Sequence, residues 1–168
     1  MNVSEAIRAR RSIRKYVPGA QIPREHVEKL LEAAMLAPSA CNTRPWEFVV
    51  LESQSIKEAF AQSHPYARHL ASASLGIVVC ARPELQDGIA TGFWPQDCGA
   101  AIENLLLEAV ALGYGGCWCG IYPNESRAKL FQNLLNVKSL PLAVITLGVP
   151  AESPAPRGHY DPTRVKYI

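Results

Sequence analysis

Hydrophobic residues recur with helical spacing near the start of the chain. Between Pro23 and Pro38 they follow the i, i+3, i+4, i+7, i+8 pattern of one buried helix face: Val27, Leu30, Leu31, Ala34 and Met35. Pro23 suits the first helical position, and Pro38 ends the segment. A shorter helix is predicted from Asn2 to Arg10, because Asn2 and Glu5 have the spacing of a capping box.

Short, continuously apolar runs rich in branched residues predict buried strands. Such runs are WEFVVL at residues 46–51, LGIVVCA at 75–81 and LPLAVITLG at 140–148, while GGCWCGI at 115–121 indicates a strand or an extended segment. Helices are predicted between them, at residues 55–62 and from an Asn124 cap to Leu135. Helices and strands therefore interleave along the chain.

The longest predicted helix lies in PQDCGAAIENLLLEAVALGYGG, residues 95–116. Nearly all of its faces are apolar, so it is expected at the centre of the core or in a subunit interface. Asp97 is expected to serve the N-terminus of this helix, and Gly113 fits its C-terminal cap. Phe93 and Trp94, just before it, either shape a substrate lid or pack as buried or interface aromatics.

Size and composition are typical of one folded domain spanning residues 1–168. The chain has 168 residues, of which 48% are hydrophobic and 19% charged, enough for one substantial core. We find no apolar run of the roughly 18 residues that a membrane span needs, and the N-terminus is charged where a signal peptide is apolar. A cytoplasmic protein without membrane partners is expected. Four prolines predict an extended C-terminal arm: Pro150, Pro154, Pro156 and Pro162.

Cationic residues gather at the two ends of a chain whose net charge is only +2. The run RARRSIRKY at residues 8–16 carries five of them around Ser12, and Arg157, Arg164 and Lys166 lie near the other end. The run is open to three interpretations: a solvated basic helix end, a phosphate clamp, or a nucleic-acid arm. The small net charge and the lack of interleaved aromatics argue against nucleic acid.

Four motifs in order resemble the FMN-dependent nitroreductase family. They are RRSIRKY, the loop and strand APSACNTRPWEFVV, the segment WPQDCGAAIENLLLEAVALGYGGCWCGIYP, and the ending PRGHYDPTRVKY. The match spans essentially the whole chain. The resemblance implies an α+β, nitroreductase-like fold, with a central mixed or antiparallel sheet flanked by helices, a long buried central helix and an extended C-terminal arm.

The resemblance also implies a set of flavin contacts. Arg10, Arg11 and Ser12 correspond to phosphate and ribityl contacts, Arg157 to a C-terminal phosphate-binding cation, and Arg14 to a cation at the pyrimidine edge of the flavin. A fixed cation at that edge stabilises the negative charge of the reduced flavin. Loop residues from the partner subunit are implied to approach the same flavin: Pro38, Ser39, Ala40 and Asn42. His159 stands where the family more often has arginine.

Cys119 and Gly120 are implied to border the flavin close to N5, where a backbone N–H is the expected partner. Larger relatives can carry an acidic residue at about the Cys119 position, so its replacement by cysteine bears on substrate range. Thiol catalysis by the cysteines that flank Trp118 is disfavoured, and all five cysteines are expected to be reduced, buried thiols: Cys41, Cys80, Cys98, Cys117 and Cys119. The four histidines have no metal-ligand spacing, so no metal site is predicted.

The functional hypothesis that follows is a homodimeric FMN enzyme with shared active sites. It would take hydride from NADH or NADPH and reduce a flat acceptor such as a nitroaromatic or quinone by ping-pong kinetics, with the flavin supplying the chemistry. The alternative is a flavin-binding carrier or sensor of the same fold that does not turn over. A nucleic-acid-binding protein is the least favoured alternative.

Overall fold

The computed structural model describes residues 1–155, 157–158 and 160–168, and the sequence predictions for Pro156 and His159 lie outside them. The helices are α1 (Val3–Ala9), α2 (Arg24–Met35), α3 (Gln54–Ser63), α4 (Trp94–Ala111) and α5 (Glu125–Leu135), with short 3-10 turns η1 to η5 between and after them. The strands are β1 (Trp46–Leu51), β2 (Leu75–Ala81), β3 (Gly115–Gly120) and β4 (Leu140–Gly148).

The strands form one sheet in the order β1-β2-β4-β3, and every neighbouring pair is antiparallel. The expected α+β architecture is confirmed, and of the two sheet types left open the antiparallel one is present. Strand β2 lies inside the sheet and is buried along its whole length, which explains its continuously apolar sequence.

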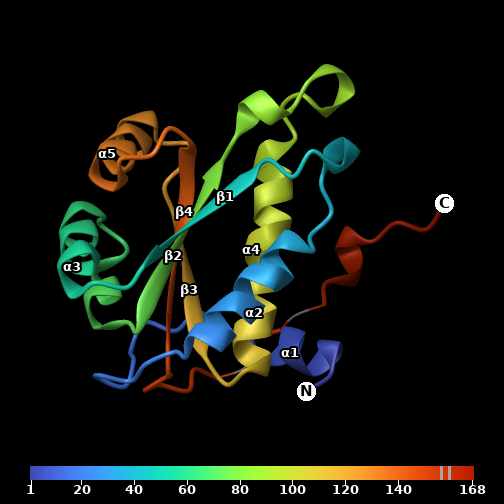
Figure 1. Ribbon diagram of the computed structural model, residues 1–168. Helices are drawn as coiled ribbons and strands as arrows, with labels where there is room; N and C mark the ends of the chain where they lie inside the picture. Colours follow the sequence, from blue (N-terminus) through green and yellow to red (C-terminus); the bar gives the residue numbers. More distant parts are fainter. Residues whose placement is uncertain (156, 159) are drawn as a thin grey trace.

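Helices cover both faces of the sheet (Figure 1). On one face α2 and α4 pack against alternate side chains such as Ile77 and Ile145, and on the other α3 and α5 pack around Val78 and Val144. Because strand side chains alternate between faces, each buried strand contributes to two cores. The sheet is therefore the middle layer of three.

The predicted helix signals are present, with one correction. Asn2 and Glu5 form the capping box of α1, and Gly113 follows α4 with φ +85°. Met35, placed on the buried face of α2, is 51% exposed because it occupies the last turn. Asp97 lies in the first turn of α4 as expected, but it does not cap the helix: its carboxylate accepts hydrogen bonds from the Ala40 N–H and from Gln86 Nε2.

Gln86 takes the capping role at the start of α4 instead. Its Oε1 accepts a hydrogen bond from the Trp94 N–H at 2.8 Å, and its amide group donates to Asp97 at 2.8 Å. This buried side chain thus satisfies one orphan N–H of the helix. Within the described residues no helix has both the length and the apolar composition required to cross a bilayer.

Candidate functional site

The segment that follows α1 and the segment that follows β4 run alongside each other. The Val17 N–H donates to the Val149 carbonyl and the Ala151 N–H to the Lys15 carbonyl, both at 2.9 Å. Arg11 Nε donates to the Ala155 carbonyl at 3.2 Å. These bonds carry the basic run and the C-terminal arm into the same region.

The N-terminal segment is also attached to the sheet. The Ile13 N–H donates to the Gly116 carbonyl at 3.0 Å, and Ser12 forms a parallel bridge with Gly116. Gly115 permits this approach, since a Cβ built there would lie 2.6 Å from Ile13 Cγ1. Tyr16 is anchored by its hydroxyl, which lies 2.7 Å from both the Ile13 carbonyl and Thr146 Oγ1. The position of Ser12 and Arg14 is therefore fixed by the core.

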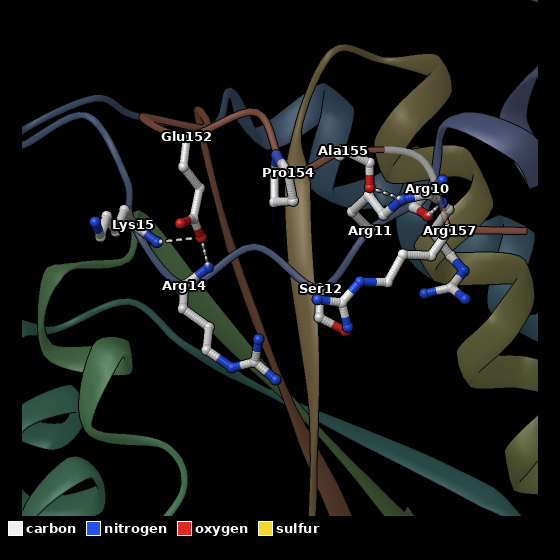
Figure 2. A pocket seen from close by; sticks show the side chains of 9 residues that line it. All are labelled: Arg10, Arg11, Ser12, Arg14, Lys15, Glu152, Pro154, Ala155 and Arg157. Atoms are coloured by element: carbon white, nitrogen blue, oxygen red, sulfur yellow. Dashed lines mark hydrogen bonds between the residues drawn. The ribbon is translucent and has the colours of Figure 1, made fainter.

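A cavity of about 610 Å³ opens between these two segments. Its lining comes from the basic run and the C-terminal arm, and five of the side chains are cationic (Figure 2): Arg10, Arg11, Arg14, Lys15 and Arg157. Ser12 contributes a hydroxyl, and Glu152 is the acidic residue of the lining. The surplus of positive charge suits a compact anion such as a phosphate.

Glu152 organises the backbone of the basic run. Its Oε1 accepts hydrogen bonds from the Arg14 N–H at 2.6 Å and from the Lys15 N–H at 3.1 Å. Both hydrogen bonds lower the pKa of the Glu152 carboxyl below its ordinary value, and the one from the Arg14 N–H has the larger effect. The Arg14 side chain extends away from Glu152 (Figure 2), so the guanidinium and the carboxylate lie on opposite sides of the segment.

The arginines of the cavity differ in the contacts that they already make within the protein. Arg10 Nε forms an ion pair with Glu103 of α4 at 3.0 Å. The Arg11 guanidinium donates to two backbone carbonyls, those of Arg10 and Ala155. Arg11 therefore ties the arm to the basic run in addition to contributing charge.

The second group of predicted site residues lies elsewhere in the chain. Pro38, Ser39 and Ala40 line a separate cavity of about 390 Å³ with Phe93 and Asp97. Their loop, around η1 (Ala40–Asn42), lies near the opposite end of α4 from α1 (Figure 1). The predicted loop contacts and the predicted phosphate contacts are thus in two different places of the chain.

The turn of this loop is built from left-handed backbone. Cys41, Asn42 and Arg44 have φ values of +49°, +55° and +49°. Asn42 Oδ1 accepts a hydrogen bond from Arg44 Nε, and the Ala40 N–H is held by Asp97. The exposed Cys41 corrects the expectation that all five cysteines are buried. Phe93, at the rim, is 42% exposed, whereas Trp94 packs edge-on against Tyr122.

Cys119 and Gly120 occupy the end of β3. The Gly120 carbonyl accepts hydrogen bonds from His64 Nε2 at 3.0 Å and from Arg127 at 3.3 Å. Cys119 Sγ lies 3.7 Å from His69 Nε2 and 4.0 Å from Cys117 Sγ. The spacing of the histidines along the chain gave no sign of this cluster, because His69 comes from another element than the two cysteines.

The two neighbouring thiols differ in acidity. The hydrogen bond from Cys119 is the largest effect that lowers the pKa of Cys117, and His69 and the charge of Arg14 act in the same direction. The same hydrogen bond, together with burial, raises the pKa of Cys119. The pair therefore releases its first proton from Cys117 and holds the second more firmly.

Sequence reasoning missed four residues of these sites: Lys15, Glu103, Glu152 and His69. Lys15 stood inside the basic run and could have been chosen for its charge alone, but Glu152 and Glu103 become relevant only once the arm and α4 are placed beside that run. A local pattern carries no signal for such long-range partners.

Comparison with known proteins supports this description. The family model described as "Nitroreductase family" matches residues 7–149. A candidate NADH dehydrogenase/NAD(P)H nitroreductase of Methanothermobacter thermautotrophicus is 42% identical over 167 residues, covering 98% of this chain and 86% of the relative.

Solved structures agree with the match. The crystal structure of a candidate NADH dehydrogenase/NAD(P)H nitroreductase from Bacteroides thetaiotaomicron has a TM-score of 0.91 and 34% identity, covering 98% of this chain and 96% of that one. A candidate nitroreductase from Desulfovibrio desulfuricans, solved in complex with FMN, has a TM-score of 0.86 and 27% identity over 100% and 97% of the two chains. The chain therefore belongs to the nitroreductase family of oxidoreductases.

Proposed function

We propose that the protein is an FMN-dependent oxidoreductase that takes hydride from NADH or NADPH and reduces a nitroaromatic, quinone or similar flat acceptor. The observation that carries this proposal is the cavity in which cations from both chain ends meet around Ser12. The FMN complex of the D. desulfuricans relative and the names of the NAD(P)H-dependent relatives support it.

The donor set fits the phosphate end of FMN. The Ser12 hydroxyl and the Arg157 guanidinium offer hydrogen-bond donors to phosphate oxygens, and Arg10 and Arg11 add charge from the same wall. Since Arg11 also holds the Ala155 carbonyl, a bound phosphate would be enclosed by two segments that already contact each other. The cavity of about 610 Å³ can accept a group of this size.

Arg14 would supply charge at the reacting end. When bound, FMN would supply the chemistry of accepting and delivering hydride. Arg14 would stabilise negative charge at the pyrimidine edge without reorganising, because Glu152 and the Ile13 to Gly116 bond fix its backbone. Cys119 and Gly120 would border the opposite, N5 side through their backbone. If both substrates use this one site in turn, ping-pong kinetics follow.

A homodimer with shared sites would reunite the divided contacts. The loop that carries Pro38, Ser39 and Ala40 lines a cavity separate from the cationic one. A second copy would therefore have to bring this loop, with Asn42, to the cationic cavity. Large apolar side chains are exposed beside α4, including Val3 at 73% and Leu36 at 75%, and they border a cavity that also includes Leu107. Such a surface is suited to burial by a second subunit.

The deciding experiment is an absorption spectrum of the purified protein, followed by anaerobic addition of NADH or NADPH. Flavin absorption that bleaches rapidly with either donor and returns on adding a quinone or nitroaromatic supports the enzyme. Flavin absorption that neither donor bleaches would identify a carrier or sensor. A colourless protein that stays colourless after incubation with FMN removes the proposal.

A further inference from the structure

Two buried thiols of β3 face the same side of the sheet. Cys117 and Cys119 are separated by one residue, so the strand turns both side chains to the same face, and they are 2% and 3% exposed. Trp118 between them points to the other face and is 41% exposed. Pairing with Thr146 and Val144 of β4 holds the two cysteines in register. The sulfur atoms are therefore presented from a rigid element.

His69 completes the cluster from η2 (Arg68–Ser72). Its Nε2 lies 3.7 Å from Cys119 Sγ, the two sulfur atoms are 4.0 Å apart, and all three donor atoms lie within 4.8 Å of one another. None of the three residues is in the lining of the cationic cavity. The cluster thus brings together side-chain donors that the proposed flavin contacts do not use, since Cys119 would border the flavin through its backbone.

These separations match those of ligands around one small soft cation. Metal–sulfur bonds of about 2.3 Å and metal–nitrogen bonds of about 2.0 Å place sulfur atoms about 4 Å apart and sulfur and nitrogen about 3.7 Å apart at trigonal angles. Two of the three separations, 4.0 and 3.7 Å, already have these values, and the third, between Cys117 Sγ and His69, is at most 4.8 Å and would shorten on binding. Thiolate and imidazole donors favour soft or borderline ions over Mg²⁺ or Ca²⁺.

We propose that Cys117, Cys119 and His69 form a binding site for one thiophilic d10 metal ion, Cu(I) or Zn(II). Three donors complete a trigonal shell for Cu(I). Zn(II) would take a water molecule as its fourth ligand, as in other zinc sites with three protein ligands. Each thiol that ligates the ion releases its proton. The site is additional to the proposed flavin function and does not rest on it.

The test is a metal titration of the full chain, purified anaerobically, reduced and stripped of metal with a chelator. Zn(II) and Cu(I) are added in separate arms against a chromophoric competitor. One ion per chain is expected in at least one arm, and X-ray absorption of that complex should show two sulfur neighbours at about 2.3 Å and one nitrogen at about 2.0 Å. Measurement on the wild-type chain keeps the test independent of how any variant folds.

Variants then assign the ligands. Cys117→Ser, Cys119→Ser and His69→Ala should each weaken binding by more than the roughly 10- to 100-fold typical of changes outside the ligand shell. Cys98→Ala removes a buried thiol that contacts the Pro45 carbonyl, and should leave affinity unchanged. The proposal is overturned by failure of both ions to bind, by coordination without sulfur, or by a folded Cys119→Ser variant of wild-type affinity.

Discussion

The guanidinium of Arg10 and the carboxylate of Glu103 form an ion pair at 3.0 Å that joins the basic run to α4. Both side chains are partly exposed, at 33% and 45%, so the pair competes with solvent and with any anion that enters the cavity. Arg10 thus meets a bound phosphate only by sharing or leaving its carboxylate partner.

Glu103→Gln should strengthen FMN binding about two- to fivefold, because it removes the carboxylate that competes with the phosphate for Arg10. This factor corresponds to the interaction energy typical of an exposed ion pair. Fluorescence titration of the apoprotein with FMN measures this. Glu28→Gln, which removes the partner of Arg24 on α2, is the matched control and should have no effect. Weaker binding by Glu103→Gln would contradict the prediction and identify Glu103 as a positioning group for Arg10.

The double change Arg10→Ala with Ser12→Ala should raise the Kd for FMN by at least about 100-fold, since a hydrogen bond to a charged group contributes roughly 1.5–3 kcal/mol. The fold should persist, because neither side chain belongs to the cores. Circular dichroism checks the fold and flavin occupancy checks binding. Unchanged occupancy, with Arg24→Ala as the reference variant, would refute the phosphate assignment.

Gly115→Ala should displace the N-terminal segment, because the new methyl group would lie 2.6 Å from Ile13 Cγ1. Overpacking of this kind costs about 1–3 kcal/mol, and the shift of Ser12 and Arg14 should lower FMN affinity as well. Gly99→Ala, inside α4, meets only Trp118 at 3.7 Å and should stabilise the protein by about 0.5–1 kcal/mol. Urea denaturation compares the free energies of unfolding of the two variants. Equal values would show that the N-terminal segment moves away from the new methyl group without a cost in stability.

His64 should make the folding stability fall as the pH drops below about 6.5. Burial lowers the pKa of this histidine below its ordinary 6.5. In the fold Nε2 faces the Gly120 carbonyl and Nδ1 accepts from the Tyr66 N–H, an arrangement that fits the neutral ring. The unfolded chain therefore binds the proton more readily, so stability is full above 6.5 and is lost as the pH falls toward the lowered pKa.

Denaturation midpoints between pH 8 and pH 5, compared with those of His64→Gln, isolate that contribution. The variant should be less stable at pH 8 but should lose less stability over the acidic range. Parallel pH profiles of the two proteins would contradict the assignment to His64.

Subunit mixing tests the shared site. One variant, Asn42→Gly, removes the side-chain amide of the loop and keeps a residue suited to φ +55°. The other variant, Arg10→Ala with Ser12→Ala, removes the proposed phosphate contacts. Dissociating and reassociating the two variants together should make about a quarter of all sites wild type, because each mixed dimer regains one complete site. Activity that never exceeds the average of the two parents would show that each site belongs to one chain.

The elements that the sequence predicted are those whose signals are local. The spacing of Val27, Leu30 and Ala34 and the capping box of Asn2 and Glu5 correctly indicated α2 and α1. The antiparallel strand order was left open, because pairing depends on how distant segments meet. Asp97 was placed at its own helix end, but a carboxylate in a first turn can equally bind a neighbouring loop, and here it holds Ala40.

The candidate site, too, could be predicted from the sequence only in part. The cations of the cavity were identified from their clustering and from the family resemblance, and the structure brings Arg10, Arg14 and Arg157 into one lining. His69 and Glu152 were missed because each lies far along the chain from the residues it contacts. Their relevance arises from the packing of η2 against β3 and of the arm against the basic run, and no short motif encodes either.

The bonding of residues 11–17 to residues 149–155 means that the cationic cavity depends on a stretch of chain that the sheet does not need. The last strand, β4, ends at Gly148, and Arg157 of the cavity lining lies beyond it. Both cores consist of residues up to Leu147. A chain shortened after β4 would therefore keep all four strands and both cores but lose one wall of the cavity.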